Sequence, residues 1–434
     1  MLKNQEELLA KLNISQLNPM QQAMETAAEK HDNITLLSPT GSGKTLGFLL
    51  PLLSRIQPQI KETQALILVP SRELALQIEQ VLRQMGTGYK INALYGGRAM
   101  SKDKEDLLQS PIIIVGTPGR IADHFRNDRI DPTDLDQLVL DEFDKSLETG
   151  FESDMSYIIS RLPNLVFRTL TSATSAIEIP SFVGLQNAKN LNFLDAKKTS
   201  KLQMKLVEAP ETGKLQVLGD LLKQLGDQNG IIFCNFRDSI QQVSDFLDKH
   251  RIPHSSFYGT MEQKDRERAL IKFRNGSTHI LLATDLAARG IDIPELKYII
   301  HFELPIKSEE FTHRNGRTAR VDKEGTAYIF KARAKSLPDF IPALKPVEIK
   351  KTRALKPPKW TTLFISGGRK DKISKGDLAG IFFKQGNLKK EELGVIELKS
   401  DCAFVAVPKE LARELQHQLN NTRIKKRKVR VYEI

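Results

Sequence analysis

Short apolar runs alternate with longer stretches of helical periodicity over residues 30–330. A continuous apolar run that is followed by turn residues and then by a helical pattern is typical of a buried parallel strand and its crossover helix. The alternation therefore predicts an α/β fold with a doubly wound parallel sheet. The first four strands are expected at 34–37, 65–69, 112–115 and 137–140.

The pattern stops at a polar stretch, residues 194–214, and then restarts. This stretch is typical of a connecting segment. The restart predicts a second α/β domain. Its strands are expected at 231–234, 279–283, 298–301 and 327–330.

A third pattern follows a proline-containing and basic stretch, residues 345–359, which has no periodicity and which we interpret as a linker. The last 75 or so residues read as strand, helix, two strands, helix and strand. This βαββαβ order predicts a small α+β module of the RNA-recognition type. The elements are expected at 363–365, 375–384, 394–398, 403–407, 411–419 and 429–432.

The positive charge of the chain is concentrated in this last module. The 434 residues carry a net charge of +12. Residues 345–434 hold 22 Lys and Arg against 10 Asp and Glu, and residues 1–344 hold 43 of each. A basic terminal module on a neutral body is typical of a nucleic-acid anchor. The alternative is a solubilising tail, but the segment also carries well-patterned apolar residues.

Other features bear on the location of the protein. No run of about 18 apolar residues is present, and the first residues lack the apolar core of a signal peptide. Cys234 and Cys402 stand in apolar runs and are expected to be buried reduced thiols. We therefore expect a cytoplasmic protein with no membrane segment and no structural metal.

The segment Ser38–Thr45 follows an expected strand and precedes an expected helix, which is the context of a phosphate-binding loop. Backbone amides from Gly41 to Lys44 would point at phosphates. Lys44 would neutralise the terminal phosphates, and the Thr45 hydroxyl would contact Mg²⁺.

Asp141 and Glu142 stand at the carboxyl end of an apolar strand, where open α/β sheets bind ligands. Asp141 could anchor hydrated magnesium, and Glu142 could polarise an attacking water. The alternative is an acidic surface turn.

Arginines recur at Arg314, Arg317 and Arg320, a spacing that places them on one face if the segment is helical. Arginines that reach a phosphate site stabilise transition-state charge. Because they lie far along the chain from the phosphate loop, two domains would have to close to complete such a site. The alternative is a basic solvated helix face.

Three further segments, 71–75, 117–120 and 283–292, each follow a strand and offer hydroxyls, backbone amides and an arginine. These groups suit contacts with a sugar-phosphate backbone. Taken singly, each segment could equally be a helix cap or a turn.

Together, these segments resemble the DEAD-box RNA helicases of superfamily 2 over residues 15–335. About ten motifs occur in the family's order, among them Asp141-Glu142-Phe143-Asp144, in which Phe143 replaces an alanine. The resemblance implies two RecA-like domains, at 1–200 and 201–344, that use ATP and Mg²⁺. It implies that ATP is bound by Gln21, Ser38, Thr40, Gly41, Ser42, Gly43, Lys44, Thr45 and Asp292. It implies that the catalytic residues are Lys44, Asp141, Glu142, Arg317 and Arg320, and that Thr45 and Asp141 bind the metal. It also implies that RNA is bound by Arg72, Gly97, Thr117, Gly119, Arg120, Thr284 and Arg289, and that Ser172 and Thr174 couple hydrolysis to strand separation.

Residues 360–434 resemble the RNA-binding domain of the DbpA-type helicases, which act on large-subunit ribosomal RNA. Phe364 fits one base-stacking position of an RNA-recognition sheet. The resemblance implies that RNA binds to the basic loop 369–375, through Arg369, Lys370 and Lys372, and to the segment 423–430.

The expected function is therefore an ATP-dependent RNA helicase, a monomer that remodels RNA locally, with large-subunit ribosomal RNA in ribosome assembly as the expected target. Two alternatives remain open from the sequence. One is an ATP-gated RNA clamp or scaffold with little hydrolysis, and the other is a DNA helicase or repair ATPase of the same superfamily.

Overall fold

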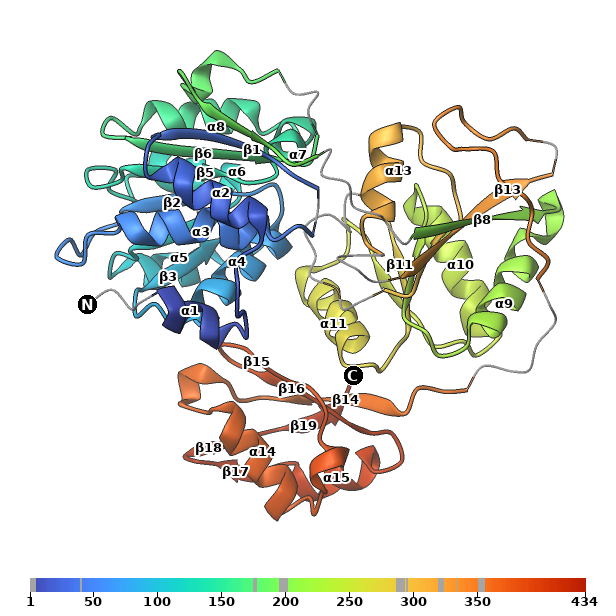
Figure 1. The fold of residues 1–434 in the computed structure, drawn as a ribbon. Coiled ribbons are helices and arrows are strands. Elements are labelled where there is room, and N and C mark those ends of the chain that lie inside the picture. Colours follow the sequence, from blue (N-terminus) through green and yellow to red (C-terminus); the bar gives the residue numbers. More distant parts are fainter. Residues whose placement is uncertain are drawn as a thin grey trace. The chain divides into compact units, whose positions relative to one another are not determined.

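Figure 1 shows the computed structural model, which describes residues 5–39, 41–174, 178–194, 202–285, 293, 296–318, 324–333, 335–349 and 356–434. The chain divides into two compact units, the first holding the elements up to β7 and the second holding those from β8 onward. Each unit is described by itself.

The first unit is built on a seven-stranded parallel sheet with the order β3-β4-β2-β5-β6-β1-β7. Its strands are β1 (Asn33–Leu37), β2 (Ala65–Leu68), β3 (Ile91–Leu94), β4 (Ile113–Gly116), β5 (Gln137–Leu140), β6 (Phe167–Ser172) and β7 (Lys189–Asn192). Its helices are α1 (Gln5–Lys11), α2 (Pro19–Ala28), α3 (Lys44–Arg55), α4 (Arg72–Met85), α5 (Met100–Leu107), α6 (Pro118–Arg126), α7 (Phe143–Glu148) and α8 (Glu152–Ser160).

Helices cover both faces of this sheet (Figure 1), and alternate residues of one strand belong to different hydrophobic cores. In β2, Ala65 and Ile67 pack in one core while Leu66 and Leu68 pack in the other. A strand buried on both faces must be apolar throughout, which explains the continuous runs in the sequence.

The second unit begins with a six-stranded parallel sheet of order β10-β11-β9-β12-β13-β8. The strands are β8 (Leu202–Ala209), β9 (Gly230–Phe233), β10 (Ser255–Phe257), β11 (Ile280–Ala283), β12 (Tyr298–His301) and β13 (Gly325–Ala332). The helices described here are α9 (Lys214–Leu225), α10 (Arg237–Lys249), α11 (Gln263–Arg274) and α13 (Ser308–Asn315). The expectation of two doubly wound parallel sheets is thus confirmed.

A third sheet, antiparallel and ordered β15-β16-β14-β19, forms the expected α+β module. The strands are β14 (Trp360–Ile365), β15 (Ile396–Leu398), β16 (Ala403–Pro408) and β19 (Val431–Glu433), and the helices are α14 (Lys375–Lys384) and α15 (Ala412–Leu419). A hairpin of β17 (Arg423–Ile424) and β18 (Arg427–Lys428) precedes the last strand. It was not predicted, because two-residue charged strands carry no apolar pattern.

The condition that would place Arg314 and Arg317 on one helical face is not met: α13 ends at Asn315, so Arg317 lies beyond the helix. One sequence expectation was wrong. Cys402 is only partly buried, whereas Cys234 is buried as expected. Burial is still the largest cause that raises the pKa of both thiols, in each case to about 12.

Two features are absent from the residues that the structure describes. No helix among them has the length and apolar character needed to cross a membrane. Within the same residues, no cluster of three or more His, Cys, Asp or Glu side chains could hold a metal ion.

Candidate nucleotide-binding and nucleic-acid-binding sites

The strand order of the first unit sorts the expected site residues into two neighbouring groups. The adjacent strands β5, β6 and β1 lead into Asp141, Ser172 and the Ser38–Thr45 loop. The adjacent strands β3, β4 and β2 lead toward Gly97, Thr117 and Arg72. Because all these strands are parallel, both groups lie at the same edge of the sheet, where ligands of open α/β sheets bind.

Glycine is required at Gly43, the residue just before α3, for two reasons. Its φ is +89°, and an added Cβ would lie 2.6 Å from Nε2 of Gln21. That amide donates to the Gly43 carbonyl at 3.1 Å. Nδ2 of Asn18 donates to the Ser42 carbonyl at 3.0 Å. The expected adenine-binding Gln21 therefore also braces the phosphate loop, together with Asn18, which the sequence analysis did not single out.

The ammonium group of Lys44 lies within the loop itself. Its Nζ donates to the carbonyls of Ser38 at 2.5 Å and Pro39 at 3.2 Å, and the residue is buried. Ser38 and Ser42 also share a hydroxyl hydrogen bond of 2.7 Å. The loop thus holds its one ammonium group and its backbone amides at the start of α3, where the helix dipole also favours phosphate.

Asp141 is 3 % exposed and accepts a hydrogen bond from Oγ1 of Thr171 at 2.5 Å. Burial raises the pKa of its carboxyl group, against the opposing effects of Thr171 and of the positive charge of Lys44. A cation beside a buried carboxylate favours the ionised form. The hard oxygens of Asp141 and Thr45 therefore suit Mg²⁺.

Glu142 has a left-handed backbone, with φ of +49°, immediately before α7. Its amide donates both to Oδ1 of Asp141 and to Oγ1 of Thr171, at 3.1 and 3.2 Å. A non-glycine residue in this conformation costs about 1–3 kcal/mol and persists only where its surroundings fix it. Asp141 and Thr171 supply that fixation, so the backbone of Glu142 has a defined position beside Asp141.

Phe143 is fully buried in one core of the first unit. Asp144 is also buried, and burial raises the pKa of its carboxyl group, although Lys145 lies 3.6 Å away.

Ser172 and Thr174, the expected coupling residues, form a local turn. Oγ of Ser172 donates to the Thr174 carbonyl at 2.9 Å and accepts from the Thr174 amide at 3.0 Å. The Ser38 amide donates to the Ser172 carbonyl at 3.0 Å, which links this turn to the phosphate loop. Four other expected site residues, Thr40, Arg289, Asp292 and Arg320, lie outside the described residues.

On the other half of the edge, Gly97 and Arg72 lie together. Gly97 has φ of +84°, and an added Cβ would lie 2.6 Å from Nη1 of Arg72. Thr117 is buried before α6, and Gly119 lies in the first turn of that helix. The structure therefore brings together four of the residues expected to contact an RNA backbone.

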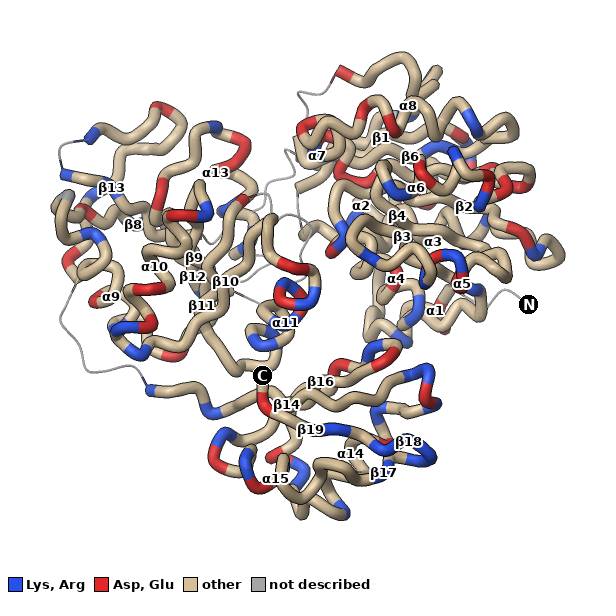
Figure 2. Tube along the Cα trace, turned by 180° about the vertical axis from the view of Figure 1, so that it is seen from behind, with Lys and Arg blue, Asp and Glu red and all other residues tan. Residues whose placement is uncertain are grey.

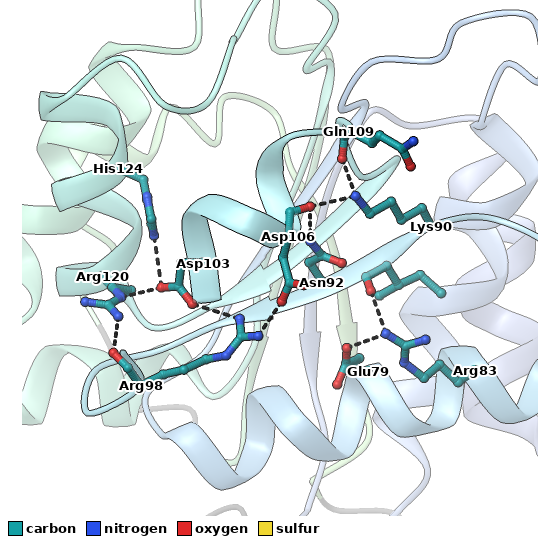
Figure 3. Close-up of polar contacts among 11 residues, drawn as sticks. Glu79, Arg83, Lys90, Asn92, Arg98, Asp103, Asp106, Gln109, Arg120 and His124 are labelled. Carbon is teal, nitrogen blue, oxygen red and sulfur yellow. Dashed lines mark hydrogen bonds and ion pairs between the residues drawn. The ribbon is translucent and has the colours of Figure 1, made fainter. Parts of the chain in front are cut away.

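Arg120, a fifth, is tied to neighbouring residues of the protein (Figure 3). Its Nε donates to Oδ2 of Asp103 at 2.6 Å, and its Nη2 donates to the Arg98 carbonyl. Its side chain is only 13 % exposed. The sequence analysis missed both Asp103 and Arg98, because their pairing depends on which helices and loops become neighbours.

In the second unit, Arg314 joins residues at the ends of three adjacent strands. Its guanidinium donates to both carboxylate oxygens of Asp285, at 2.7 and 2.5 Å, to Oδ1 of Asn235 at 2.7 Å and to the Glu303 carbonyl at 2.6 Å. These partners follow β11, β9 and β12, and Arg314 itself is 1 % exposed. It is a buried structural cation and not the solvated basic face that one alternative proposed. Thr284 stands beside Asp285, and Arg317 is buried just past the helix end.

His301, at the end of β12, contacts Oδ1 of Asn315 through Nε2 at 3.0 Å. Burial, followed by the positive charge of Arg314, lowers the pKa of His301 to about 3. The unfolded chain therefore binds a proton here below about pH 6.5, whereas the folded chain does not until about pH 3.

Between these limits, the free energy of unfolding of the second unit is expected to fall by up to about 1.4 kcal/mol for each unit of decreasing pH. A His301→Gln variant should lose this contribution while keeping an amide donor. Urea unfolding at pH 5 and 6.5, monitored in the second unit, measures it. An equal pH dependence in the variant would show that His301 is not the responsible group.

In the α+β module, the two basic segments named from the sequence come together. Nζ of Lys425 donates to the Lys372 carbonyl at 2.5 Å and pairs with Asp377 at 2.8 Å. Nε of Arg427 lies 3.6 Å from Asp371. The hairpin β17–β18 therefore lies beside the 369–372 turn. Lys and Arg line the hairpin (Figure 2), and Arg369, Lys370 and Lys372 are exposed.

The open face of the antiparallel sheet is occupied by α11 within the same unit. The guanidinium of Arg268 lies 5.9 Å from the ring centroid of Phe364 and donates to the Tyr432 hydroxyl at 3.3 Å. Arg274 pairs with Glu397 through two bonds of 2.6 and 2.8 Å. Phe364 thus packs against an arginine of the protein, so the base-stacking role expected of it would require α11 to move away.

Comparisons with known proteins agree with this geometry. Residues 18–181 match the DEAD/DEAH box helicase family, residues 213–322 the helicase conserved C-terminal domain, and residues 362–433 the DbpA RNA-binding domain.

Among similar proteins are two ATP-dependent RNA helicases DbpA. That of Escherichia coli is 33 % identical over 96 % of this chain and 94 % of its own length, and that of Bacillus subtilis is 30 % identical over 95 % and 93 %. A structure of S. cerevisiae Dbp5 bound to RNA and ADP BeF3 aligns with 75 % of this chain and 87 % of its own, at 26 % identity and a TM-score of 0.67. This chain therefore belongs to the DEAD-box ATP-dependent RNA helicases, in the family of the DbpA proteins.

Proposed function

We propose that this helicase couples ATP hydrolysis to local remodelling of large-subunit ribosomal RNA during ribosome assembly, working as a monomer in the cytoplasm. The observation that carries the proposal is the presence, in one chain, of a phosphate loop beside the buried carboxylate of Asp141 and of a separate basic surface on a DbpA-type module. The first supplies energy, and the second supplies a place for structured RNA to bind.

In the nucleotide site, the amides of Gly41 to Lys44 and the Lys44 ammonium bind the phosphates. Asp141 and Thr45 would hold Mg²⁺, which would supply neutralisation of charge on the phosphate oxygens. Glu142 accepts a hydrogen bond from the attacking water and orients it. Arg317 and Arg320 stabilise the charge that develops on the transferring phosphoryl group.

The RNA-binding residues of the first unit, Arg72, Gly97, Thr117 and Gly119, hold the phosphate backbone of one strand. Thr284 extends this role to the second unit, and Arg289, which lies outside the described residues, has the same proposed role. Ser172 and Thr174 connect RNA to hydrolysis, because their turn is bonded to the phosphate loop through the Ser38 amide. Backbone contacts carry no sequence information, so the core acts on RNA generally.

Target choice then falls to the α+β module. Its open sheet face contacts α11, whereas the 369–372 turn and the hairpin β17–β18 are exposed and basic. Structured RNA held there raises the effective concentration of nearby duplex at the core. The matches to the two relatives named DbpA span 96 % and 95 % of this chain and so include most of this module, which itself matches the DbpA RNA-binding domain. This supports the target expected from the DbpA-type resemblance.

The experiment that tests the target compares the ATPase of two triple variants with that of the native chain. Arg369→Ala/Lys370→Ala/Lys372→Ala should raise the concentration of a large-subunit ribosomal RNA fragment needed for half-maximal stimulation about tenfold or more. It should also lower the salt slope of that constant by about 2–3, since each phosphate contact contributes about 0.9.

The matched control is Lys384→Ala/Lys389→Ala/Lys390→Ala, which removes the same charge from exposed positions of the same module. Its half-maximal concentration should stay within about twofold of the native value. An equal rise of the half-maximal RNA concentration in both triple variants would show that the module acts only as an unspecific basic anchor. Equal stimulation of the native chain by ribosomal and scrambled RNA would contradict the proposed target.

A further inference from the structure

Asp103 is a charged residue in a position where a helix normally places an apolar one. In α5, which is described throughout, it is the one residue that is buried, and it is 0 % exposed. An isolated buried carboxylate would cost several kcal/mol, so such a group persists only with partners that satisfy its charge.

Asp103 has three such partners, which come from two different segments (Figure 3). Nη1 of Arg98 lies 2.8 Å from Oδ1, while Nε of Arg120 and Nε2 of His124 lie 2.6 and 3.2 Å from Oδ2. Burial by itself would raise the pKa of Asp103. The hydrogen bonds from His124 and Arg120 and the charges of Arg120 and Arg98 outweigh it and lower the pKa, so the group is ionised.

The two segments joined in this way are the backbone-binding loops of the first unit. Arg98 directly follows Gly97, and Arg120 directly follows Gly119. Nη2 of Arg120 also donates to the Arg98 carbonyl, which adds a second link between the loops. Gly97 in turn lies against the guanidinium of Arg72, so all three RNA-facing segments of this unit are connected through one cluster.

We propose that Asp103 is a positioning residue that fixes the spacing between the loop at Gly97 and the first turn of α6 at Gly119, and that Arg120 serves RNA binding through this brace and not by contacting a phosphate itself. The inference deepens the proposed RNA-binding role of the first unit and rests on it. A helicase that binds a strand by its backbone needs successive phosphate sites at a fixed distance, and a shared carboxylate between rigid guanidinium forks provides it.

An Asp103→Asn variant separates positioning from simple electrostatics by the sign of its effect. Removing a negative charge near an RNA site should strengthen binding if only charge matters. Loss of the brace should instead raise the concentration of single-stranded oligo(U) needed for half-maximal ATPase about tenfold or more. We expect the kcat at saturating RNA to change less than threefold, because the nucleotide site lies on the other half of the sheet edge.

Asp106→Asn is the matched control. Asp106 also pairs with Arg98, but its side chain is 31 % exposed. Arg120 donates instead to Asp103 and to the Arg98 carbonyl, so the link between the two segments survives the loss of Asp106. Its half-maximal RNA concentration should stay within about twofold of the native value, as should its RNA-independent ATPase. Equal effects of Asp103→Asn and Asp106→Asn would contradict the brace.

Arg120→Lys provides a second variant that keeps the buried charges balanced in case Asp103→Asn does not fold. Lysine retains the positive charge but loses the fork that reaches both Asp103 and the Arg98 carbonyl. Its half-maximal RNA concentration should rise about as much as that of Asp103→Asn, and the double variant should be no worse than either single one. Additive losses would indicate a direct phosphate contact by Arg120 and would overturn the proposal.

Unstructured oligo(U) keeps this test separate from the ribosomal target. If oligo(U) stimulates the native chain and both Asp103→Asn and Arg120→Lys need the same half-maximal concentration of oligo(U), the proposed brace is overturned while the proposed ribosomal target is not affected. If ribosomal RNA proves no better than scrambled RNA while these variants weaken oligo(U) binding, only the proposed target fails. A lowered melting temperature with an unchanged half-maximal RNA concentration would assign Asp103 a purely structural role.

Discussion

Replacing Glu142 with glutamine is expected to lower the RNA-stimulated kcat for ATP hydrolysis by about 10²- to 10⁴-fold, while ATP affinity changes only a few-fold. Glutamine has the same shape but cannot accept a proton from the attacking water. The backbone that carries the side chain is fixed by bonds from its amide to Asp141 and Thr171, so the substitution leaves the site's geometry in place.

The control for this variant is Glu148→Gln. Glu148 lies at the other end of α7, pairs with Lys145 at 2.6 Å and has a side chain that is 40 % exposed. The two variants make the same change of charge on the same short helix. Steady-state ATPase measures the kcat of each variant, and binding of a fluorescent ATP analogue measures its affinity for the nucleotide. A kcat for Glu142→Gln within threefold of the native value would remove Glu142 from the mechanism.

Replacing Arg314 with alanine is expected to destabilise the second unit by about 3–5 kcal/mol, because it leaves the Asp285 carboxylate without its cation in a largely buried site. It also removes donors from Asn235 and from the Glu303 carbonyl. Hydrogen exchange of the β9 amides in the full chain should accelerate by about 10²- to 10³-fold, if these amides exchange through opening of that unit.

Arg237→Ala is the comparison for Arg314→Ala. Arg237 is exposed at the start of α10, and its guanidinium lies 5.7 Å from the Tyr258 ring centroid. Its loss should change stability by less than about 1 kcal/mol. Equal protection of β9 in the native chain and in Arg314→Ala would show that the buried pair contributes nothing net.

The strands and the phosphate loop could be predicted because their signals are local. β2 is apolar at every position, and β5 is apolar after Gln137. The segment Ser38–Thr45 lies between an apolar run and a helical pattern that can both be recognised in the sequence. The helix α14 was predicted at its observed bounds, with Ser374 and Asp377 forming a capping box at its start.

Features that depend on long-range neighbours could not be predicted. Asp103 and Arg120 are joined only because α5 and α6 become neighbours in the fold. Arg314 belonged to a series of arginines expected to reach a phosphate site, and its burial follows from the convergence of β9, β11 and β12. Phe364 was correctly placed on the open sheet face, but nothing near it in sequence indicates that α11 covers it.

The most direct test of the account is the steady-state ATPase of the full chain without nucleic acid, with RNA, and with DNA of the same sequence. We predict low ATPase activity without nucleic acid, strong stimulation by RNA and little stimulation by DNA. The stimulation by RNA should be lost in Glu142→Gln. ATP-dependent RNA binding without stimulated hydrolysis would contradict it in favour of a clamp, and equal stimulation by DNA would contradict the assignment of RNA as the substrate.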